Sequence, residues 1–254
     1  MGIGRTDKLK TLLALWQPQT IMTSKQLKLL GITPQHVQKY VASKWVEVVS
    51  PGVLRRSKDT VTWQGALHSL QKQVALRVHV GALTALMADG SSHYARPGQE
   101  TVFLFAETGV TLPKWFREYP WPEQISLTQT RVLPSDLGVR LAELGGFDLQ
   151  TSAPERAILE ALHLSPNAID LVEISQVIEG LRTLRPAVMQ ALLEACTSFK
   201  VKRLFLFLGT RAGLPVMSRL NREAIPLGSG DRTITPGGAY ISEFGLIVPK
   251  ELAS

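Results

Sequence analysis

The chain of 254 residues contains a single cysteine and no long apolar run. Acidic side chains are few among its first 60 residues. The one cysteine, Cys196, cannot form an internal disulfide, which is typical of a reducing cytoplasm. We expect it to be a buried structural thiol because apolar residues flank it. No apolar run approaches the roughly 20 residues of a membrane span, and the N-terminus lacks the apolar core of a signal peptide. We therefore expect a cytoplasmic protein without membrane contact.

Catalytic and metal-binding motifs are also missing. The histidines form no H-E-x-x-H motif, and no cysteine–histidine spacing suits zinc. There is no Asp-x-Asp pair for two metal ions, no G-x-S-x-G turn and no P-loop. Gly228–Asp231 could bind a phosphate through backbone amides, although a hairpin turn is the commoner explanation. We predict no enzymatic activity, no cofactor and no metal site.

What the sequence does contain is a compact pattern from Thr20 to Arg56. Thr23 can cap a short helix, with Gln26 reaching back in a capping box, and Gly31 ends that helix. A second helix starts at Thr33-Pro34, where proline suits the first helical position. The pattern predicts two consecutive helices joined by a glycine turn.

A basic hairpin follows the second helix. Trp45–Val49 and Val53–Arg56 are predicted strands, and Ser50–Gly52 is the turn between them. A helix from Asp7 to Trp16 would complete a three-helix core. Together these elements are typical of a winged helix-turn-helix, and the alternative is a helical hairpin that only packs.

The excess positive charge lies entirely in this segment. Residues 1–60 hold ten basic and three acidic side chains, and the remaining 194 residues hold 18 of each, so the net charge of +7 belongs to the segment. Such a distribution is expected of a module that displaces counterions from phosphates. The second helix and the hairpin supply the candidate DNA-binding residues, which are Thr33, Gln35, His36, Gln38, Lys39, Ser43, Arg55, Arg56 and Lys58.

Further helices and strands are expected beyond residue 60. The run Leu204–Leu208 fits either a buried strand or a buried helix, because a short apolar run does not distinguish them. A capping box at Ser152 predicts the start of a strong helix, and Pro113–Phe116 is expected to lie in a loop. The other predicted helices are 64–75, 82–88, 169–184 and 186–199, and the predicted strands are 76–80, 93–94, 102–106, 125–133 and 240–249.

We predict an α/β (α+β) fold with two domains. The first, residues 1–92, is the winged helix-turn-helix with its trailing helix, and the second, residues 93–254, is a mixed α/β domain. The second domain carries a run of basic residues without an acid, for which a solvated face is the ordinary explanation and an acidic or nucleic-acid partner the alternative. These residues are Lys200, Lys202, Arg203, Arg211, Arg219 and Arg222.

Several motifs resemble the AbiEi family, the type IV antitoxins of abortive-infection systems. They are Gly65–Val74, Val78–Leu86, Ser92–Tyr94, Ser152–Glu160, Leu192–Cys196, Lys200–Leu206 and Leu227–Arg232, in order over most of the chain. The resemblance implies a bacterial antitoxin whose winged helix represses its own operon. It also implies a C-terminal domain that neutralises a nucleotidyltransferase-like toxin, without requiring a stable complex. Gly81-Ala82 departs from the Gly-Gly that the family often has, and no catalytic residue carries over.

Our leading hypothesis is therefore a DNA-binding autorepressor that is also an antitoxin in phage defence. Its partners would be double-stranded operator DNA and the toxin, with a monomer in solution and pairing on DNA both open. The alternatives are a nucleic-acid-processing enzyme with an appended winged helix and a pure interaction protein. The basic run from Lys200 to Arg222 is the candidate antitoxin surface. We expect the two functions to separate along the chain, so that removing residues 1–60 abolishes repression alone.

Overall fold

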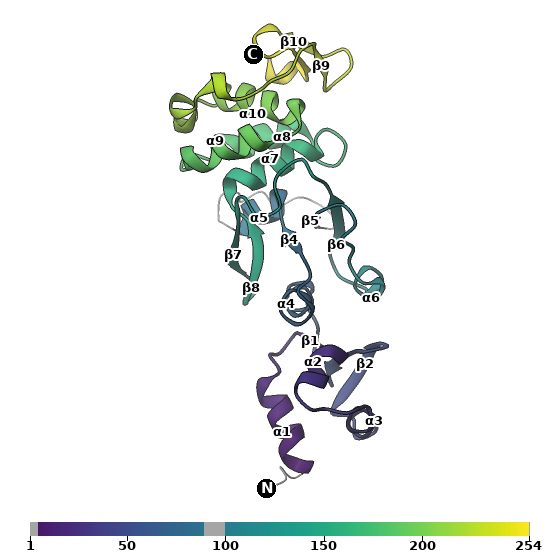
Figure 1. The fold of residues 1–254 in the computed structure, drawn as a ribbon. Coiled ribbons are helices and arrows are strands. Elements are labelled where there is room, and N and C mark those ends of the chain that lie inside the picture. The colour runs from purple at the N-terminus through teal and green to yellow at the C-terminus, as the bar shows by residue number, and fades with distance from the viewer. Residues whose placement is uncertain (1–4, 89–99, 254) are drawn as a thin grey trace. The chain divides into compact units, whose positions relative to one another are not determined.

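The computed structural model describes residues 5–88 and 100–253 (Figure 1). By its internal contacts the chain divides into two compact units. The N-terminal unit comprises Met1–Val78, Thr111–Pro122 and Ala142–Leu149, and the C-terminal unit comprises His79–Val110, Glu123–Leu141 and Gln150–Ser254. Two short segments from the middle of the sequence thus belong to the N-terminal unit.

The N-terminal unit begins with alternating helices and short strands. In chain order these are α1 (Arg5–Leu15), β1 (Ile21–Thr23), α2 (Ser24–Leu29), α3 (Pro34–Ala42), β2 (Val46–Ser50), β3 (Val53–Arg56) and α4 (Trp63–Val74). The strands form an antiparallel sheet in the order β1-β3-β2. The order of elements is that of a helix-turn-helix followed by a hairpin wing. Its core consists of Leu12, Trp16, Met22, Leu27, Ile32, Tyr40, Val46 and Leu54.

The helix ends follow from local sequence. The Thr23 hydroxyl accepts a hydrogen bond from the Gln26 amide at 3.3 Å, which caps α2. The expected return bond from the Gln26 side chain is absent, because the Thr23 amide donates to Gln73 Oε1 of α4 at 2.8 Å. Gly31 follows α2 with a φ of +68°, a conformation that glycine adopts without steric cost. Thr23 therefore caps α2 with its hydroxyl and connects β1 to α4 with its amide.

The C-terminal unit is built on a five-stranded sheet in the order β6-β5-β4-β8-β7. β5 pairs with β6 and β4 pairs with β8, both in parallel. The division between the units cuts through β7 and β8. The strands are β4 (Val78–Val80), β5 (Thr101–Ala106), β6 (Gln124–Gln129), β7 (Val139–Leu144) and β8 (Phe147–Ser152), and α5 (Ala82–Ala88) follows β4. The helix α6 (Lys114–Glu118) lies between β5 and β6 in the sequence and belongs to the N-terminal unit.

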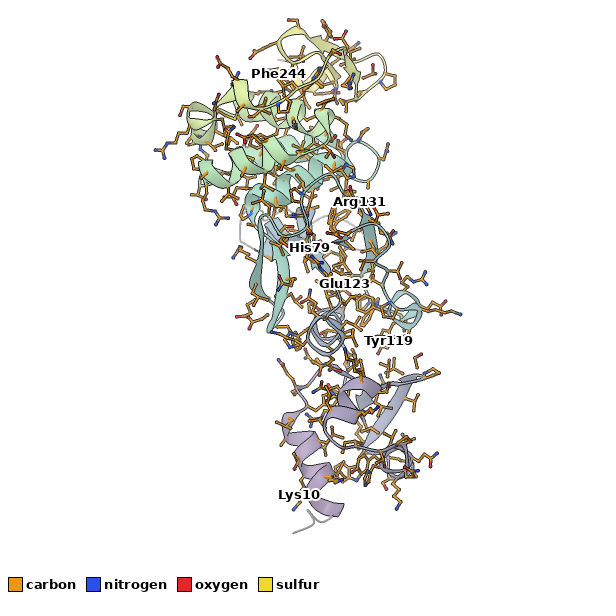
Figure 2. All side chains as sticks on the ribbon, viewed as in Figure 1. Lys10, His79, Tyr119, Glu123, Arg131 and Phe244 are labelled. Atoms are coloured by element: carbon orange, nitrogen blue, oxygen red, sulfur yellow. The ribbon has the colours of Figure 1, made fainter. Side chains whose placement is uncertain are left out.

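Four longer helices complete the C-terminal unit. They are α7 (Pro154–Leu164), α8 (Leu171–Glu179), α9 (Pro186–Ala195) and α10 (Phe199–Arg211), and α7 packs against the other three and against α5. A small sheet in the order β10-β11-β9 ends the chain, formed by β9 (Arg232–Thr233), β10 (Ala239–Ile241) and β11 (Leu246–Val248). Phe244 packs on Phe207 of α10 with ring centroids 5.8 Å apart and so attaches this sheet (Figure 2).

The α/β fold class is confirmed, and several local predictions need correction. The run Leu204–Leu208, for which a strand and a helix were both open, is helical within α10. The predicted loop at Pro113–Phe116 contains the helix α6. Ser152 does not cap α7, because its hydroxyl donates to Glu160 instead. Strands β7 and β8 were not predicted, and the predicted strand at His93–Tyr94 lies outside the described residues. Within the described residues no helix is long and apolar enough to cross a membrane.

Candidate nucleic-acid interface and basic surface

The outer face of α3 presents polar side chains to solvent. Gln35, Gln38 and Lys39 are exposed, and none of their side chains has a bonding partner within the described part of the chain. The opposite face carries Tyr40, which is 8% exposed and packs into the core. Amide and ammonium groups held on a rigid helix can bond to base edges and phosphates. The helix thus has a polar outer face and an inner face that packs, as the i, i+3, i+4 spacing of Val37, Tyr40 and Val41 in the sequence indicates.

Both ends of α3 are capped by residues that the sequence placed among the DNA-binding candidates, namely Thr33 and His36 at the start and Ser43 at the end. The Thr33 amide donates to His36 Nδ1 at 3.1 Å, and the Thr33 hydroxyl accepts from the His36 amide at 3.4 Å. Because Nδ1 accepts a hydrogen bond, the ring proton lies on Nε2, which remains available as a donor. Ser43 caps the other end, where its amide donates to the Lys39 carbonyl at 2.9 Å.

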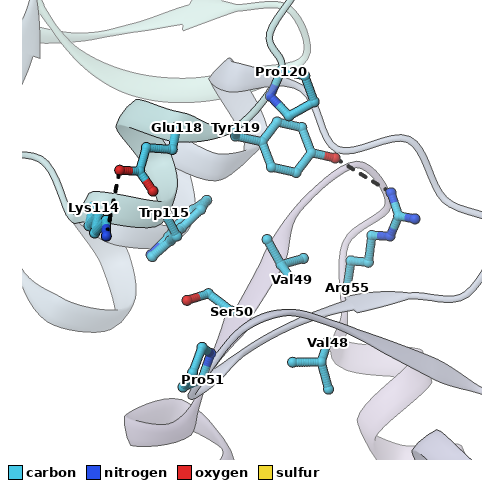
Figure 3. Close-up of a pocket in the computed structure, with 10 residues that line it drawn as sticks. All are labelled: Val48, Val49, Ser50, Pro51, Arg55, Lys114, Trp115, Glu118, Tyr119 and Pro120. Atoms are coloured by element: carbon cyan, nitrogen blue, oxygen red, sulfur yellow. Dashed lines mark hydrogen bonds and ion pairs between the residues drawn. The ribbon is translucent and has the colours of Figure 1, made fainter.

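The wing arginines are bound within the N-terminal unit. Arg55 donates from Nε and Nη2 to Glu47 Oε2 at 2.9 and 2.6 Å. Its Nη1 donates to the Tyr119 hydroxyl at 3.4 Å (Figure 3). Hydrogen bonds from Arg55 and Ser57 lower the pKa of Glu47. Arg56 Nη1 donates to the Trp16 carbonyl at 3.1 Å. Both guanidinium groups therefore hold the wing, and Lys58 is left as the exposed cation after it.

The segment Thr111–Pro122 lies beside the wing, which the sequence did not indicate. A groove of about 660 Å³ separates the wing residues Val48–Pro51 from α6, and Trp115 and Tyr119 line its far wall (Figure 3). Tyr119 and Trp121 pack with ring centroids 4.2 Å apart. Arg55, through Tyr119, is the hydrogen-bonded link between the wing and this segment.

Three members of the predicted C-terminal basic surface bind backbone carbonyls. Lys200 Nζ donates to the carbonyls of His163 and Ser165 at 3.0 and 2.6 Å. Lys202 is only 2% exposed, and its Nζ donates to the Pro226 carbonyl at 3.0 Å. Burial lowers the pKa of both lysines. Lys202 is therefore buried and does not belong to a solvent-facing surface, whereas Lys200 is half-buried with its ammonium bound to carbonyls.

Arg203 organises the glycine-rich loop that follows α10. Its guanidinium donates to the carbonyls of Leu227 and Gly228 at 2.9 Å each, and to the Gly230 carbonyl at 2.6 Å. The side chain is buried, so Arg203 also leaves the predicted surface. The loop turns carbonyl oxygens, not amides, toward a cation, which is the opposite of what a bound phosphate requires.

The other three basic residues remain at the surface. Arg211 lies 3.8 Å from Glu179, and Arg222 lies 3.3 Å from Glu243 and donates to the Thr210 hydroxyl at 2.9 Å. Arg219 is exposed and has no bonding partner in the described part of the chain. The candidate surface is thus reduced to three arginines, two of which are paired with exposed carboxylates.

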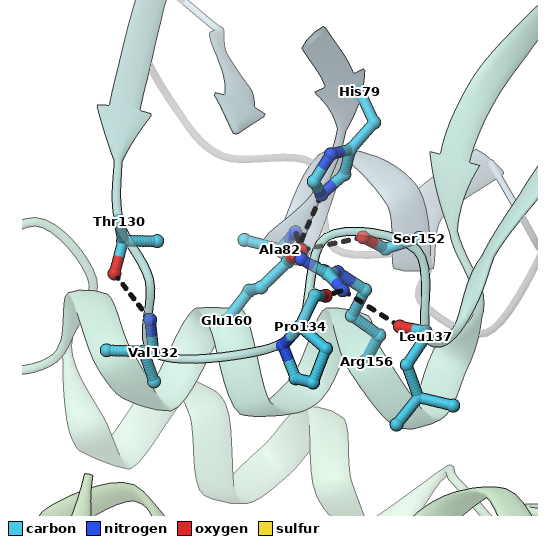
Figure 4. Close-up of polar contacts among 9 residues, drawn as sticks. All are labelled: His79, Ala82, Thr130, Val132, Pro134, Leu137, Ser152, Arg156 and Glu160. Carbon is cyan, nitrogen blue, oxygen red and sulfur yellow. Dashed lines mark hydrogen bonds and ion pairs between the residues drawn. The ribbon is translucent and has the colours of Figure 1, made fainter. Parts of the chain in front are cut away.

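A buried polar cluster was missed by the sequence analysis. Glu160 accepts from His79 Nε2 at 2.8 Å, from Arg156 Nε at 2.6 Å and from the Ser152 hydroxyl at 2.8 Å (Figure 4). The Ala82 amide donates to the same carboxylate at 3.2 Å. Burial acts to raise the pKa of Glu160, but His79 and Arg156 outweigh it and the pKa lies below its ordinary value.

This cluster joins four elements of the C-terminal unit, because its members come from β4, α5, β8 and α7. Each carboxylate oxygen of Glu160 accepts two hydrogen bonds. Full pairing of this kind is typical of a buried charge that stabilises the fold. A signal was present in the sequence, since Arg156 and Glu160 have the i, i+4 spacing of an ion pair on a largely apolar helix. Among the described residues, histidine, cysteine, aspartate and glutamate form no group of three that could hold a metal ion.

Comparison with known proteins gives the family. Residues 5–96 match a family model described as "Transcriptional regulator, AbiEi antitoxin N-terminal domain". Residues 99–249 match one described as "Transcriptional regulator, AbiEi antitoxin, Type IV TA system". No curated protein matches the chain. The crystal structure of the RV2827C protein from Mycobacterium tuberculosis shares the fold, with a TM-score of 0.63 at 12% identity over 98% of this chain and 93% of that one. The chain belongs to the AbiEi antitoxin family of transcriptional regulators from type IV toxin–antitoxin systems.

Proposed function

We propose that this protein represses its own operon by binding operator DNA through the N-terminal unit, and that it also neutralises a nucleotidyltransferase-like toxin. The observation that carries the first part is the coincidence of two features in one module. The entire net charge of +7 lies in residues 1–60. The same residues present α3 with an unpaired polar outer face. Counterion release then drives the affinity, and α3 selects the sequence.

The roles of the candidate residues differ. Gln35, Gln38 and the His36 Nε2 proton contact base edges in the major groove, and Lys39 neutralises a phosphate. Lys58 neutralises a second phosphate beside the wing. Arg55 and Arg56 act indirectly, because their hydrogen bonds hold the wing in place.

The DNA-binding proposal is tested by titrating the protein with a labelled fragment of its own promoter over a series of salt concentrations. Lys39→Ala should weaken binding and reduce the slope of log K against log salt by about 0.9, the value for one phosphate contact. Lys72→Ala is the matched control, because Lys72 is an exposed lysine on α4 of the same unit. Equal slopes for the Lys39→Ala variant and the control would contradict the assignment of α3.

The antitoxin part is assigned to the C-terminal unit, where Arg211, Arg219 and Arg222 form the remaining basic surface. Changing all three to glutamate should abolish the rescue of cells that express the cognate toxin. The control is Arg131→Glu with Lys250→Glu, two exposed basic residues of the same unit. Rescue by the triple variant at the wild-type level, with normal protein abundance, would remove these arginines from the proposal.

A further inference from the structure

A second groove lies within the N-terminal unit, and the residue that it shares with the proposed base contacts is Gln38. It has a volume of about 840 Å³ and is lined by α2, the turn after it, the first half of α3 and the wing. Its apolar lining includes Leu27, Ile32 and Leu54, which are 4, 6 and 4% exposed. The Ser24 amide donates to the Gly52 carbonyl at 2.8 Å and so ties the wing turn to α2. The volume is within the range of about 300–1,000 Å³ that is usual for small-molecule sites.

The walls of this groove leave apolar surface in contact with water. Val48, on the wing side, is 57% exposed, and Val37, on the α3 side, is only half-buried. Exposed apolar surface of this kind is typical of a binding site. A DNA duplex presents phosphates and polar base edges, so it would not cover the apolar lining of this groove.

Two lysines at the edge of the groove indicate that its ligand has an anionic head group. Lys25 and Lys28 both line the groove, and their spacing of three residues places them on one face of α2. Neither ammonium has a bonding partner within residues 5–88 and 100–253, and no acidic residue lines the groove. An apolar chamber with two free cations at its rim complements a ligand with an apolar tail and a carboxylate head.

We propose that this groove binds an aliphatic carboxylate of the fatty-acid class, with its tail among Leu27, Ile32 and Leu54 and its carboxylate at Lys25 and Lys28. The groove touches both α3 and the wing, the two elements assigned to DNA. A bound ligand therefore lowers the affinity for the operator. That effect rests on the proposed function, whereas the binding itself does not.

Binding is tested on the full chain with decanoate as the probe and 1-decanol as its uncharged counterpart. The readout is the NMR signal of labelled methyl groups on Leu27, Ile32 and Val37. Decanoate should shift these signals saturably, and 1-decanol should bind at least about tenfold more weakly because it forms no charge-assisted bond. The proposal is wrong if decanoate causes no saturable shift below the concentration at which it forms micelles, or if both probes bind equally.

Two variants locate the head and the tail. Lys25→Gln with Lys28→Gln should reduce the affinity for decanoate to that for 1-decanol, whereas Lys10→Gln with Lys72→Gln should change nothing. Lys10 lies on α1 and is exposed (Figure 2). Lys72 lies on α4 and is also exposed. Val48→Trp should weaken both probes by filling the groove. Unchanged decanoate affinity in either groove variant would overturn the assignment, and the methyl spectra report whether each variant is folded.

The regulatory effect is measured by adding decanoate to the operator titration. The expected result is weaker DNA binding by wild-type protein and no effect on the Lys25→Gln, Lys28→Gln variant. If wild-type protein binds no operator at all, the proposed function fails while the methyl titration still decides the site. If decanoate occupies the groove and operator affinity stays unchanged, the regulatory part of the inference is wrong.

Discussion

The buried side chain of Arg203 holds the glycine-rich loop of the C-terminal unit through hydrogen bonds to its carbonyls. Arg203 binds the carbonyls of Leu227, Gly228 and Gly230, and at 3.3 Å also that of Gly245. Five hydrogen-bond donors in a rigid fork make arginine suited to this role. The family motif Leu227–Arg232 is therefore explained by a loop that must wrap around a guanidinium, and no ligand is needed to account for it.

We predict that Arg203→Ala lowers the free energy of unfolding by at least about 3 kcal/mol, because several buried carbonyls lose a charged donor. Chemical denaturation followed by circular dichroism gives the value. Arg219→Ala is the matched control, since Arg219 is exposed, and its effect should stay within about 0.5 kcal/mol. Similar losses for both variants would show that the loop does not depend on Arg203.

Glu160 provides a second prediction at this scale. Glu160→Gln should lower the free energy of unfolding by about 3–5 kcal/mol at neutral pH, because Arg156 is left buried beside a neutral group. In the wild type the pKa of Glu160 is below its ordinary value. Its contribution to stability is therefore full above the ordinary glutamate pKa of about 4.3 and is lost as the pH falls below that value.

Denaturation at pH 7 and at pH 4 separates this effect from a general acid effect. The difference in stability between wild type and Glu160→Gln should shrink at the lower pH. A difference that does not shrink over this range would mean that folding does not lower the pKa of Glu160.

At the scale of elements, two glycines act through different physical causes. Gly31 ends α2 with a φ of +68°, and a Cβ there would meet open space. Gly65 lies inside α4, where a Cβ would collide with the backbone carbonyl of Gln19 and the ring of Phe147. The first glycine is required by backbone conformation, and the second by the close approach of α4 to the chain before β1.

We therefore predict that Gly31→Asn is tolerated and that Gly31→Ala costs roughly 1 kcal/mol, because asparagine visits the left-handed region more readily than alanine. Gly65→Ala should cost about 3 kcal/mol, near the upper end for overpacking, despite the better helix propensity of alanine. The midpoint temperature of thermal unfolding, measured for the three variants, ranks their stabilities. A Gly65→Ala variant more stable than Gly31→Ala would contradict the close approach.

At the scale of the whole molecule, the N-terminal unit is larger than the first 60 residues. The amide of Ile21 donates to the Ser69 hydroxyl at 3.3 Å, and that of Thr23 to Gln73 at 2.8 Å. α4 has its buried side chains, including Trp63 and Leu67, in this unit. Deleting residues 1–60 would expose these side chains, so we expect the truncated chain to lose its cooperative unfolding transition. A truncated chain that does not fold cannot show whether repression and neutralisation are separate functions.

Point variants give the sharper test that the two functions are separable. Gln38→Ala with Lys39→Ala should lose operator repression, measured with a promoter reporter, and should keep rescue from the toxin. The Arg211, Arg219, Arg222 triple glutamate variant should show the reverse pattern. Loss of both functions in either variant, at normal protein abundance, would mean that repression and neutralisation depend on one surface.

The sequence alone determined the features that depend on neighbouring residues. Caps and breakers at Thr23, Gly31, Thr33 and Pro34 predicted the two helices of the helix-turn-helix, because these residues act within one turn of the chain. Alternation and a Ser-Pro-Gly turn predicted the hairpin, and simple counting located the positive charge in residues 1–60. The spacing of Val37, Tyr40 and Val41 likewise indicates which face of α3 is exposed, because the helical period depends on near neighbours alone.

Only the tertiary structure decided which charged groups face solvent and which distant segments meet. Lys202 and Arg203 belong to a basic run in the sequence, yet they are buried because the loop at 226–230 folds over α10 and supplies carbonyl oxygens. The parallel pairing of β4 with β8, and the place of Thr111–Pro122 beside the wing, join residues far apart in the chain. Local sequence carries no record of such contacts, since their free energy arises only when separate elements pack together.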